Sequence, residues 1–140
     1  MPEPFCLAMV LCDAIHRDAA TGKFTILGTF STIQSKQYPA DIRFTVYFAI
    51  TDGLGVTPVR LRIVDSKSGL AEEEGATDIF CSPPEELNFT SPLVVVEAAA
   101  LIEAQLPTPG LYHCELFAGD QLLMSRRLVA VPPNIPEANA

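Results

Sequence analysis

The segment that most constrains the fold is residues 109–131, which begins PGLYHC and passes through Gly119-Asp120 into a final apolar run. Gly110 followed by Tyr112, with a small residue two positions later, has the spacing of a tyrosine corner. In that motif the phenol hydroxyl hydrogen-bonds to nearby backbone at the start of a late strand. Gly119 and Asp120 suit a two-residue hairpin, because such turns require positive φ. The segment predicts two antiparallel strands that close a β-sandwich.

Two further stretches show the period of two that is typical of strands with one buried face. The clearest is 42–51, where Ile, Phe, Val, Phe and Ile alternate with more polar residues. The second is 59–64, where Arg60 and Arg62 alternate with apolar residues and share one face. Residues 65–69 (DSKSG) have the composition of a turn. We therefore expect two strands here, with the two arginines directed away from the core.

The N-terminal third predicts two more strands. Residues 5–15 are apolar on both faces, with large side chains at 5, 7, 9 and 11, so we expect this strand to be covered on both sides. A second strand is predicted over 24–33, and Gly28 within it indicates a bulge or a close backbone approach. Asp13 is the first charge after the apolar run, and we expect it to cap a turn.

The middle of the chain has weaker patterns. Residues 70–92 support no single period, although 77–81 are compatible with a short edge strand. Residues 93–106 combine β-branched residues with helix formers. A strand is predicted because the apolar residues keep a period of two and the tyrosine corner needs a strand before it. A helix over about 97–105 is the alternative.

Together these patterns predict an all-β fold, an immunoglobulin-like antiparallel β-sandwich of about seven to eight strands. The 140 residues suit a single domain over 1–140, with short proline-bearing tails at 1–4 and 132–140. No repeat or linker divides the chain.

The charge balance excludes several classes of partner. The formal net charge is -8, so a phosphate backbone or an anionic membrane is repelled on average. The N-terminus has no basic leader, and its apolar run is too short to span a bilayer, which predicts a cytoplasmic protein. Positive charge gathers only locally, at Arg60 and Arg62 and again at Arg126 and Arg127. A solvated face is the favoured interpretation of such pairs, and an anion site is the alternative.

The four cysteines predict neither a metal centre nor a disulfide framework. They stand at 6, 12, 81 and 114, without the short paired spacings of a zinc site. In a reducing compartment we expect four reduced and mostly buried thiols. A bridge from Cys6 or Cys12 to Cys114 is the alternative. No cofactor is predicted.

No catalytic constellation is evident. The chain has two histidines, and His113 stands beside Cys114, so the two side chains are expected on opposite faces of a strand. His16 is expected in a solvated loop. The consecutive acids at 72–74 read as an acidic loop rather than a calcium site. No catalytic or metal-binding residue is therefore predicted.

Contact surfaces are the remaining candidates. Tyr38, Tyr47 and Phe117 are expected outward or near turns, where aromatic residues often serve as contacts. The last strand, 122–131, is apolar on both faces, so a homodimer or other protein contact is expected there, with Leu123 in the interface.

A resemblance to a known family rests on an ordered set of turn and strand motifs. These are LCDA at 11–14, TGK at 21–23, TILGTF at 25–30, YP at 38–39, PGLY at 109–112 and GD at 119–120. In this order they resemble a family of small bacterial proteins known as a domain of unknown function, over about residues 5–131. The resemblance implies a cytoplasmic β-sandwich, carries over no catalytic or binding residue, and implies no immunoglobulin-type disulfide at Cys114.

Three functional hypotheses follow. The leading one is a non-enzymatic β-sandwich that acts as a protein-interaction or structural module and binds a protein partner or a second copy of itself. The second is a small-molecule or carbohydrate-binding domain that uses the outward aromatics, with Tyr47, and the Arg60 and Arg62 face. The third is a hydrolase, which requires His16 or His113 beside a buried acid or cysteine.

Overall fold

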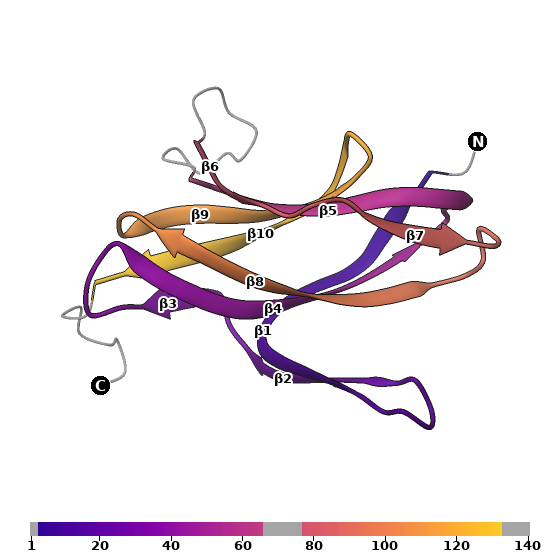
Figure 1. Ribbon diagram of the computed structural model, residues 1–140, viewed down its shortest axis with the longest axis horizontal. Coiled ribbons are helices and arrows are strands. Elements are labelled where there is room, and N and C mark those ends of the chain that lie inside the picture. Colours follow the sequence, from indigo (N-terminus) through magenta and orange to yellow (C-terminus); the bar gives the residue numbers. More distant parts are fainter. Residues whose placement is uncertain (1–2, 66–76, 133–140) are drawn as a thin grey trace.

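The fold is a sandwich of two β-sheets, seen in a computed structural model that describes residues 3–65 and 77–132 (Figure 1). The described residues form ten strands. One sheet has four strands in the order β2-β1-β4-β8, and the other has the order β3-β10-β9-β5-β6, with β7 also paired to β5. The strands are β1 (Phe5–Arg17), β2 (Phe24–Thr29), β3 (Thr32–Gln34), β4 (Ala40–Thr51), β5 (Gly55–Asp65), β6 (Thr77–Cys81), β7 (Glu85–Phe89), β8 (Val96–Leu106), β9 (Gly110–Ala118) and β10 (Gln121–Val131). The predicted immunoglobulin-like sandwich is confirmed, with more strands than expected.

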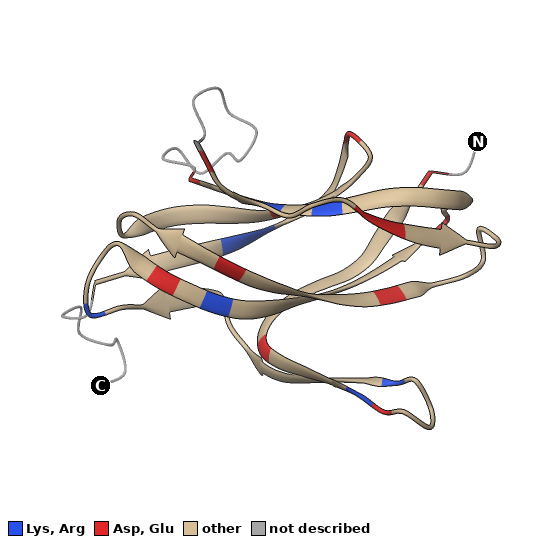
Figure 2. Cartoon of the chain, viewed as in Figure 1, with Lys and Arg blue, Asp and Glu red and all other residues tan. Residues whose placement is uncertain are grey.

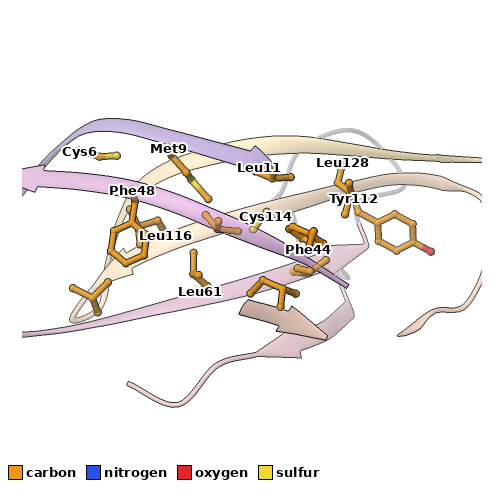
Figure 3. Packing of buried hydrophobic residues seen from close by; sticks show 14 of the residues in the cluster. Cys6, Met9, Leu11, Phe44, Phe48, Leu61, Tyr112, Cys114, Leu116 and Leu128 are labelled. Carbon is orange, nitrogen blue, oxygen red and sulfur yellow. The ribbon is translucent and has the colours of Figure 1, made fainter. Parts of the chain in front are cut away.

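The core lies between the sheets and follows the predicted alternation (Figure 3). In β4 the apolar residues at 42, 44, 46, 48 and 50 are all buried, as predicted, and so are those at 59, 61 and 63 in β5. β8 is a strand throughout, so the helix alternative for 97–105 is wrong. It pairs with β4 along its whole length, from Val96 to Leu106, and its inward residues, including Ile102 and Leu106, pack against the core.

The tyrosine corner forms as predicted. The hydroxyl of Tyr112 donates a hydrogen bond to the Thr108 carbonyl at 2.6 Å and accepts one from the Thr108 amide at 3.3 Å. Tyr112 and Cys114 are fully buried. Gly110 begins β9, and Gly119 and Asp120 form the two-residue turn to β10, with Gly119 at a φ of 59°. Asp120 does not need positive φ, because Gly119 alone takes that conformation.

The prediction that β1 is covered on both sides is wrong at its start. A β-bulge between Cys6 and Ala8 adds one residue, so the side-chain parity changes there. Cys6 and Met9 therefore face the core, while Phe5 and Leu7 are exposed. A period-two reading cannot detect an added residue, because both parities of this run are apolar.

β1 is longer than predicted, and it bends. Asp13 lies within the strand instead of capping a turn, with its carboxylate against Gly28, where an added Cβ would overlap it. The turn is made by Asp18, which accepts hydrogen bonds from the Thr21 amide (3.2 Å) and hydroxyl (2.6 Å). The predicted close approach at Gly28 is confirmed. Beyond this point the β1–β2 hairpin leaves the plane of the four-stranded sheet (Figure 1).

Two boundaries differ from prediction. The expected strand over 24–33 is divided into β2 and β3, because the chain crosses from one sheet to the other, where β3 pairs in parallel with β10. β7 was not predicted, since prolines and acids at 83–86 hide its inward residues Leu87 and Phe89. The predicted edge strand 77–81 is confirmed as β6. The acidic run at 72–74, residues 66–69 of the predicted turn, and residues 1–2 and 133–140 of the predicted tails lie outside the described residues.

Candidate functional site

The first arginine pair lies on the outer face of the six-stranded sheet and is engaged by its neighbours. Arg60 and Arg62 flank the ring of Phe117 on β9, with guanidinium carbons 4.4 Å and 5.0 Å from its centroid. Arg62 also donates two hydrogen bonds to one carboxylate oxygen of Glu115, at 2.8 Å and 2.6 Å, and lies 3.5 Å from Asp78. Arg60 contacts the Cys81 sulfur at 3.7 Å. These arginines are part of an internal network rather than a free anion site.

Glu115 is the residue that sequence reasoning missed. Its side chain is 0% exposed, although it lies on an outer face, opposite Arg62 in the β5–β9 register. A buried carboxylate is unfavourable unless it is paired, and the guanidinium provides that pairing. The available signal was an isolated acid in the otherwise apolar run 114–118.

Glu115 is one of three neighbouring polar side chains on the outer face of the six-stranded sheet. His113 and Glu115 are two residues apart on one face of β9, and Ser125 on β10 lies directly opposite Glu115. Each has a buried polar atom with no hydrogen-bond partner in the structure: Nδ1 of His113, Oε2 of Glu115 and Oγ of Ser125. His113, expected to face outward, does lie on the outer face, but it is only 7% exposed.

This grouping contains the residue types of a hydrolase but not its geometry. A nucleophile must be hydrogen-bonded to its base, and the base to an orienting acid. Here these three atoms remain unpaired and shielded from solvent. Burial lowers the pKa of His113, Glu115 partly opposes this, and Arg127 lowers it further. His16 is exposed near the end of β1. The arrangement therefore supports a packed polar cluster rather than a catalytic triad.

The second arginine pair, Arg126 and Arg127 on β10, is exposed, and no acidic partner reaches it within the described residues. Arg126 lies opposite Cys114, on the core-facing side, and it partly offsets the rise that burial causes in the Cys6 pKa. Arg127 lies opposite His113, on the outer side. Figure 2 shows the basic positions on β5 and on β10. The two guanidinium groups of this pair thus emerge on opposite faces of one strand.

Arg126 and Arg127 line a cleft of about 650 Å³ at the open side of the sandwich, between β1 and β10. The lining is completed by Val10, Leu11, Thr29, Phe30, Ser31 and Ser125. β3 pairs with β10 only at 129–131, so within the described residues the edge of β10 over 121–128 has no neighbouring strand. On the other sheet, β2 pairs with β1 only from Cys12 onward and the Phe30 amide donates to the Leu11 carbonyl, which leaves 5–10 without a paired strand on this side. We call the β10 edge over 121–128 with this cleft the open edge.

Several exposed apolar residues belong to the segments at the end of the sandwich where β1 begins and where the β4–β5 and β7–β8 connections meet (Figure 1). Thr51 at the end of β4 pairs with Phe5 and hydrogen-bonds to the Pro92 and Val94 carbonyls, which ties the three segments together. Among the described residues, six of the eight exposed large apolar side chains belong to these segments or adjoin them: Phe5, Leu7, Leu54, Val56, Leu93 and Val95. We call these six residues the apolar end.

The predicted contact residues Tyr38, Tyr47 and Leu123 have packing partners within the chain. Tyr47 is buried on the outer face of the four-stranded sheet, stacks on Phe24 with centroids 5.6 Å apart, and donates to the Glu97 carboxylate. Burial and Glu97 raise the pKa of Tyr47 to about 12. Tyr38 donates to the Val131 carbonyl at 2.8 Å. Leu123, placed at a bulge in β10, packs against the core, so the second apolar face of this strand has an internal explanation.

All four cysteines are free thiols, as predicted, and the bridge alternative is not formed. Cys6, Cys12 and Cys114 are buried, while Cys81 is exposed. Burial raises the pKa of Cys114 to about 12. Across residues 3–65 and 77–132, no group of three His, Cys, Asp or Glu side chains is arranged to hold a metal ion. The same residues include no helix that is long and apolar enough to cross a membrane.

The comparisons with known proteins agree with this architecture. The family of unknown function DUF6941 matches residues 7–131. The chain belongs to this family. Among solved structures, an immunoglobulin-like protein from Pseudomonas aeruginosa is similar, with a TM-score of 0.50 and 14% sequence identity over 92% of this chain and 97% of that one. No curated protein matches the sequence. This DUF6941 member therefore shares a fold with a bacterial immunoglobulin-like protein, and its role must be argued from its surfaces.

Proposed function

We propose that this DUF6941 member is a non-enzymatic, cytoplasmic protein-interaction module that binds an extended segment of a partner protein along the open edge. The observation that carries the proposal is the unpaired edge of β10 over 121–128 beside a cleft. Unpaired edge amides and carbonyls are a template for an added strand, and many modules bind peptides in this way.

β3 supports the proposal because it occupies the same edge further along β10. The Val129 amide donates to the Ser31 carbonyl at 2.8 Å, and β3 then runs parallel to β10 for three residue pairs. Backbone groups of alternate residues point to the same side of a strand. The amides of Arg127 and Ser125 therefore also face the open edge, where the crossover chain has left them without a strand.

Hydrogen exchange at these amides tests the proposal. The probes are three eight-residue peptides that differ only in their centre: VTVEEVTV, VTVQQVTV and VTVKKVTV. We expect at least one to slow exchange of the Ser125 and Arg127 amides by roughly tenfold at a peptide concentration about ten times its Kd. VTPQQPTV, whose prolines remove backbone donors, is the matched control and should give no protection. The absence of protection by all three at millimolar concentration would contradict the proposal.

A substitution in the protein, rather than in the peptide, tests the same proposal. Ser125→Pro removes an amide that faces the open edge and leaves the ladder between β9 and β10 intact, because proline is accepted at edge positions. The variant should keep cooperative unfolding and lose peptide binding. Retained binding would show that the peptide sits elsewhere.

Self-association through the apolar end is a second candidate function. Leu93 is 90% exposed, and Leu54 in the adjoining β4–β5 connection is 58% exposed. Apolar patches of this kind mark contact surfaces, and a surface rich in uncharged side chains suits two copies that each carry a net charge of -8.

Sedimentation at micromolar concentrations tests this second candidate. The wild type should form dimers, and Leu54→Ser with Leu93→Ser should weaken them at least about tenfold, the effect of losing one to two buried leucine contacts. Leu27→Ser with Leu101→Ser, which alters exposed leucines outside the apolar end, is the control. A wild type that remains monomeric at all concentrations would rule out this surface.

A further inference from the structure

We infer that the segment received by the open edge carries two consecutive acidic residues, one for each guanidinium of Arg126 and Arg127. The inference rests on the proposed function and specifies its partner chemistry. The starting observation is a charge contrast. The chain has a net charge of -8, yet two adjacent, exposed cations line the cleft of about 650 Å³, and no acidic partner reaches them in the described residues.

The strand geometry places the two cations on opposite faces of any added strand. Arg126 lies on the side of Cys114 and Arg127 on the side of His113. On one face of a sheet, side chains of directly opposed residues have Cβ atoms about 4.5–5.5 Å apart. Because Arg126 and Arg127 are consecutive, their cross-strand partners are also consecutive. Two adjacent carboxylates would therefore each meet one guanidinium, which is a charge-assisted contact.

The rest of the cleft favours apolar neighbours for these acids. Val10, Leu11 and Phe30 line it from the opposite sheet and the crossover. A bound strand would direct alternate side chains toward them, because successive side chains point to opposite faces. β10 pairs regularly with β9 from Met124 onward, after its bulge. The expected ligand is thus a short strand of β-branched residues with an acidic pair at its centre.

The first arginine pair shows that this chain can neutralise strand arginines internally. Arg62 has Glu115 and Asp78 as partners, and both Arg60 and Arg62 stack on Phe117. No such partners reach Arg126 or Arg127 in the described residues. An inward-pointing charge and a bulge at an edge also hinder unwanted strand pairing. The competing explanation is that Arg126 and Arg127 prevent unwanted pairing of β10 with other chains. The experiment must distinguish this role from the binding of an acidic segment.

Fluorescence anisotropy with the labelled peptides tests the inference. VTVEEVTV should bind roughly tenfold or more tightly than VTVQQVTV, since a hydrogen bond to a charged group contributes this much. VTVKKVTV should bind most weakly, and added salt should reduce the preference for VTVEEVTV. Arg126→Ser and Arg127→Ser should each remove part of the preference. Arg43→Ser, which removes an exposed arginine from β4, should leave it unchanged.

Charge reversal provides the decisive arm. Arg126→Glu with Arg127→Glu should invert the order of the peptides, so that VTVKKVTV binds best. Equal binding of the three peptides to the wild type, with protected edge amides, would overturn the inference and leave the proposed function standing. If no peptide protects the edge and the Arg126→Ser, Arg127→Ser double variant aggregates, the arginines serve edge protection, and both proposals fail.

Discussion

The two arginine pairs have similar sequence patterns and different structural fates. Arg60 and Arg62 lie on β5, which has neighbouring strands on both sides, and they are enclosed by Phe117, Glu115 and Asp78. Arg126 and Arg127 lie on β10 where one side has no strand, and they remain exposed. The difference shows that strand position, rather than residue type, decides whether a surface cation is structural or available. Within the described residues, no acidic side chain neutralises the two cations at the open edge.

The largest expected effect is at Arg62. Arg62→Met should reduce the free energy of unfolding by about 3–5 kcal/mol, because it leaves the fully buried carboxylate of Glu115 without its partner. Urea denaturation at pH 7 measures this. Adding Glu115→Gln to Arg62→Met should recover part of the loss, since the buried charge is then removed. A loss below about 1 kcal/mol, the range of surface ion pairs, would show that the network is not buried in solution.

A smaller effect is expected at Arg60. Its guanidinium stacks on Phe117, and Arg60→Ala should cost about 0.5–1 kcal/mol of unfolding free energy, the range for an exposed cation–π contact. The same substitution should also change the environment of Cys81, which Arg60 contacts.

A thiol-labelling reagent should react rapidly with Cys81 alone, because the other three cysteines are buried. Rapid labelling of a second cysteine would contradict the described packing.

His113 lies between the two arginine pairs, because it is opposite Arg127 in the strand register and two residues from Glu115, the partner of Arg62. Its titration provides a test of the packing by pH. Burial lowers its pKa, Glu115 partly opposes this and Arg127 lowers it further, so the folded chain holds this imidazole neutral to a lower pH than the unfolded chain does. The unfolded chain takes up a proton near the ordinary value of 6.5. The unfolded state therefore binds more protons as the pH falls below about 7, and stability decreases. His113→Asn should flatten the stability profile between about pH 7 and 5.5. An unchanged slope in His113→Asn would show that this imidazole is not buried neutral.

Local patterns were sufficient for much of the fold but not for the site. The Tyr112 corner, the Gly119 turn and the alternation in β4 depend on neighbours within a few residues, so the sequence predicts them correctly. The bulge after Cys6 and the strand β7 were missed, because an added residue or two prolines disturb a period of two.

The contact between Arg62 and Glu115 joins residues 53 positions apart and depends on strand register, which composition does not reveal. The open edge was anticipated only as an apolar second face of the last strand, and the structure moves the emphasis from Leu123 to the arginines beside it.

The smallest expected effect on stability is at the second pair, and it tests the comparison most directly. Arg126→Ser with Arg127→Ser should change the unfolding free energy by less than about 0.5 kcal/mol at pH 7, because neither side chain has an ion-pair partner among the described residues. Since Arg127 lowers the pKa of His113, its removal should slightly reduce the loss of stability on acidification. Urea denaturation at pH 7 and pH 5.5 measures both effects. A loss comparable with that of Arg62→Met would mean that β10 has an internal partner after all, and the open edge would then be occupied by the chain itself.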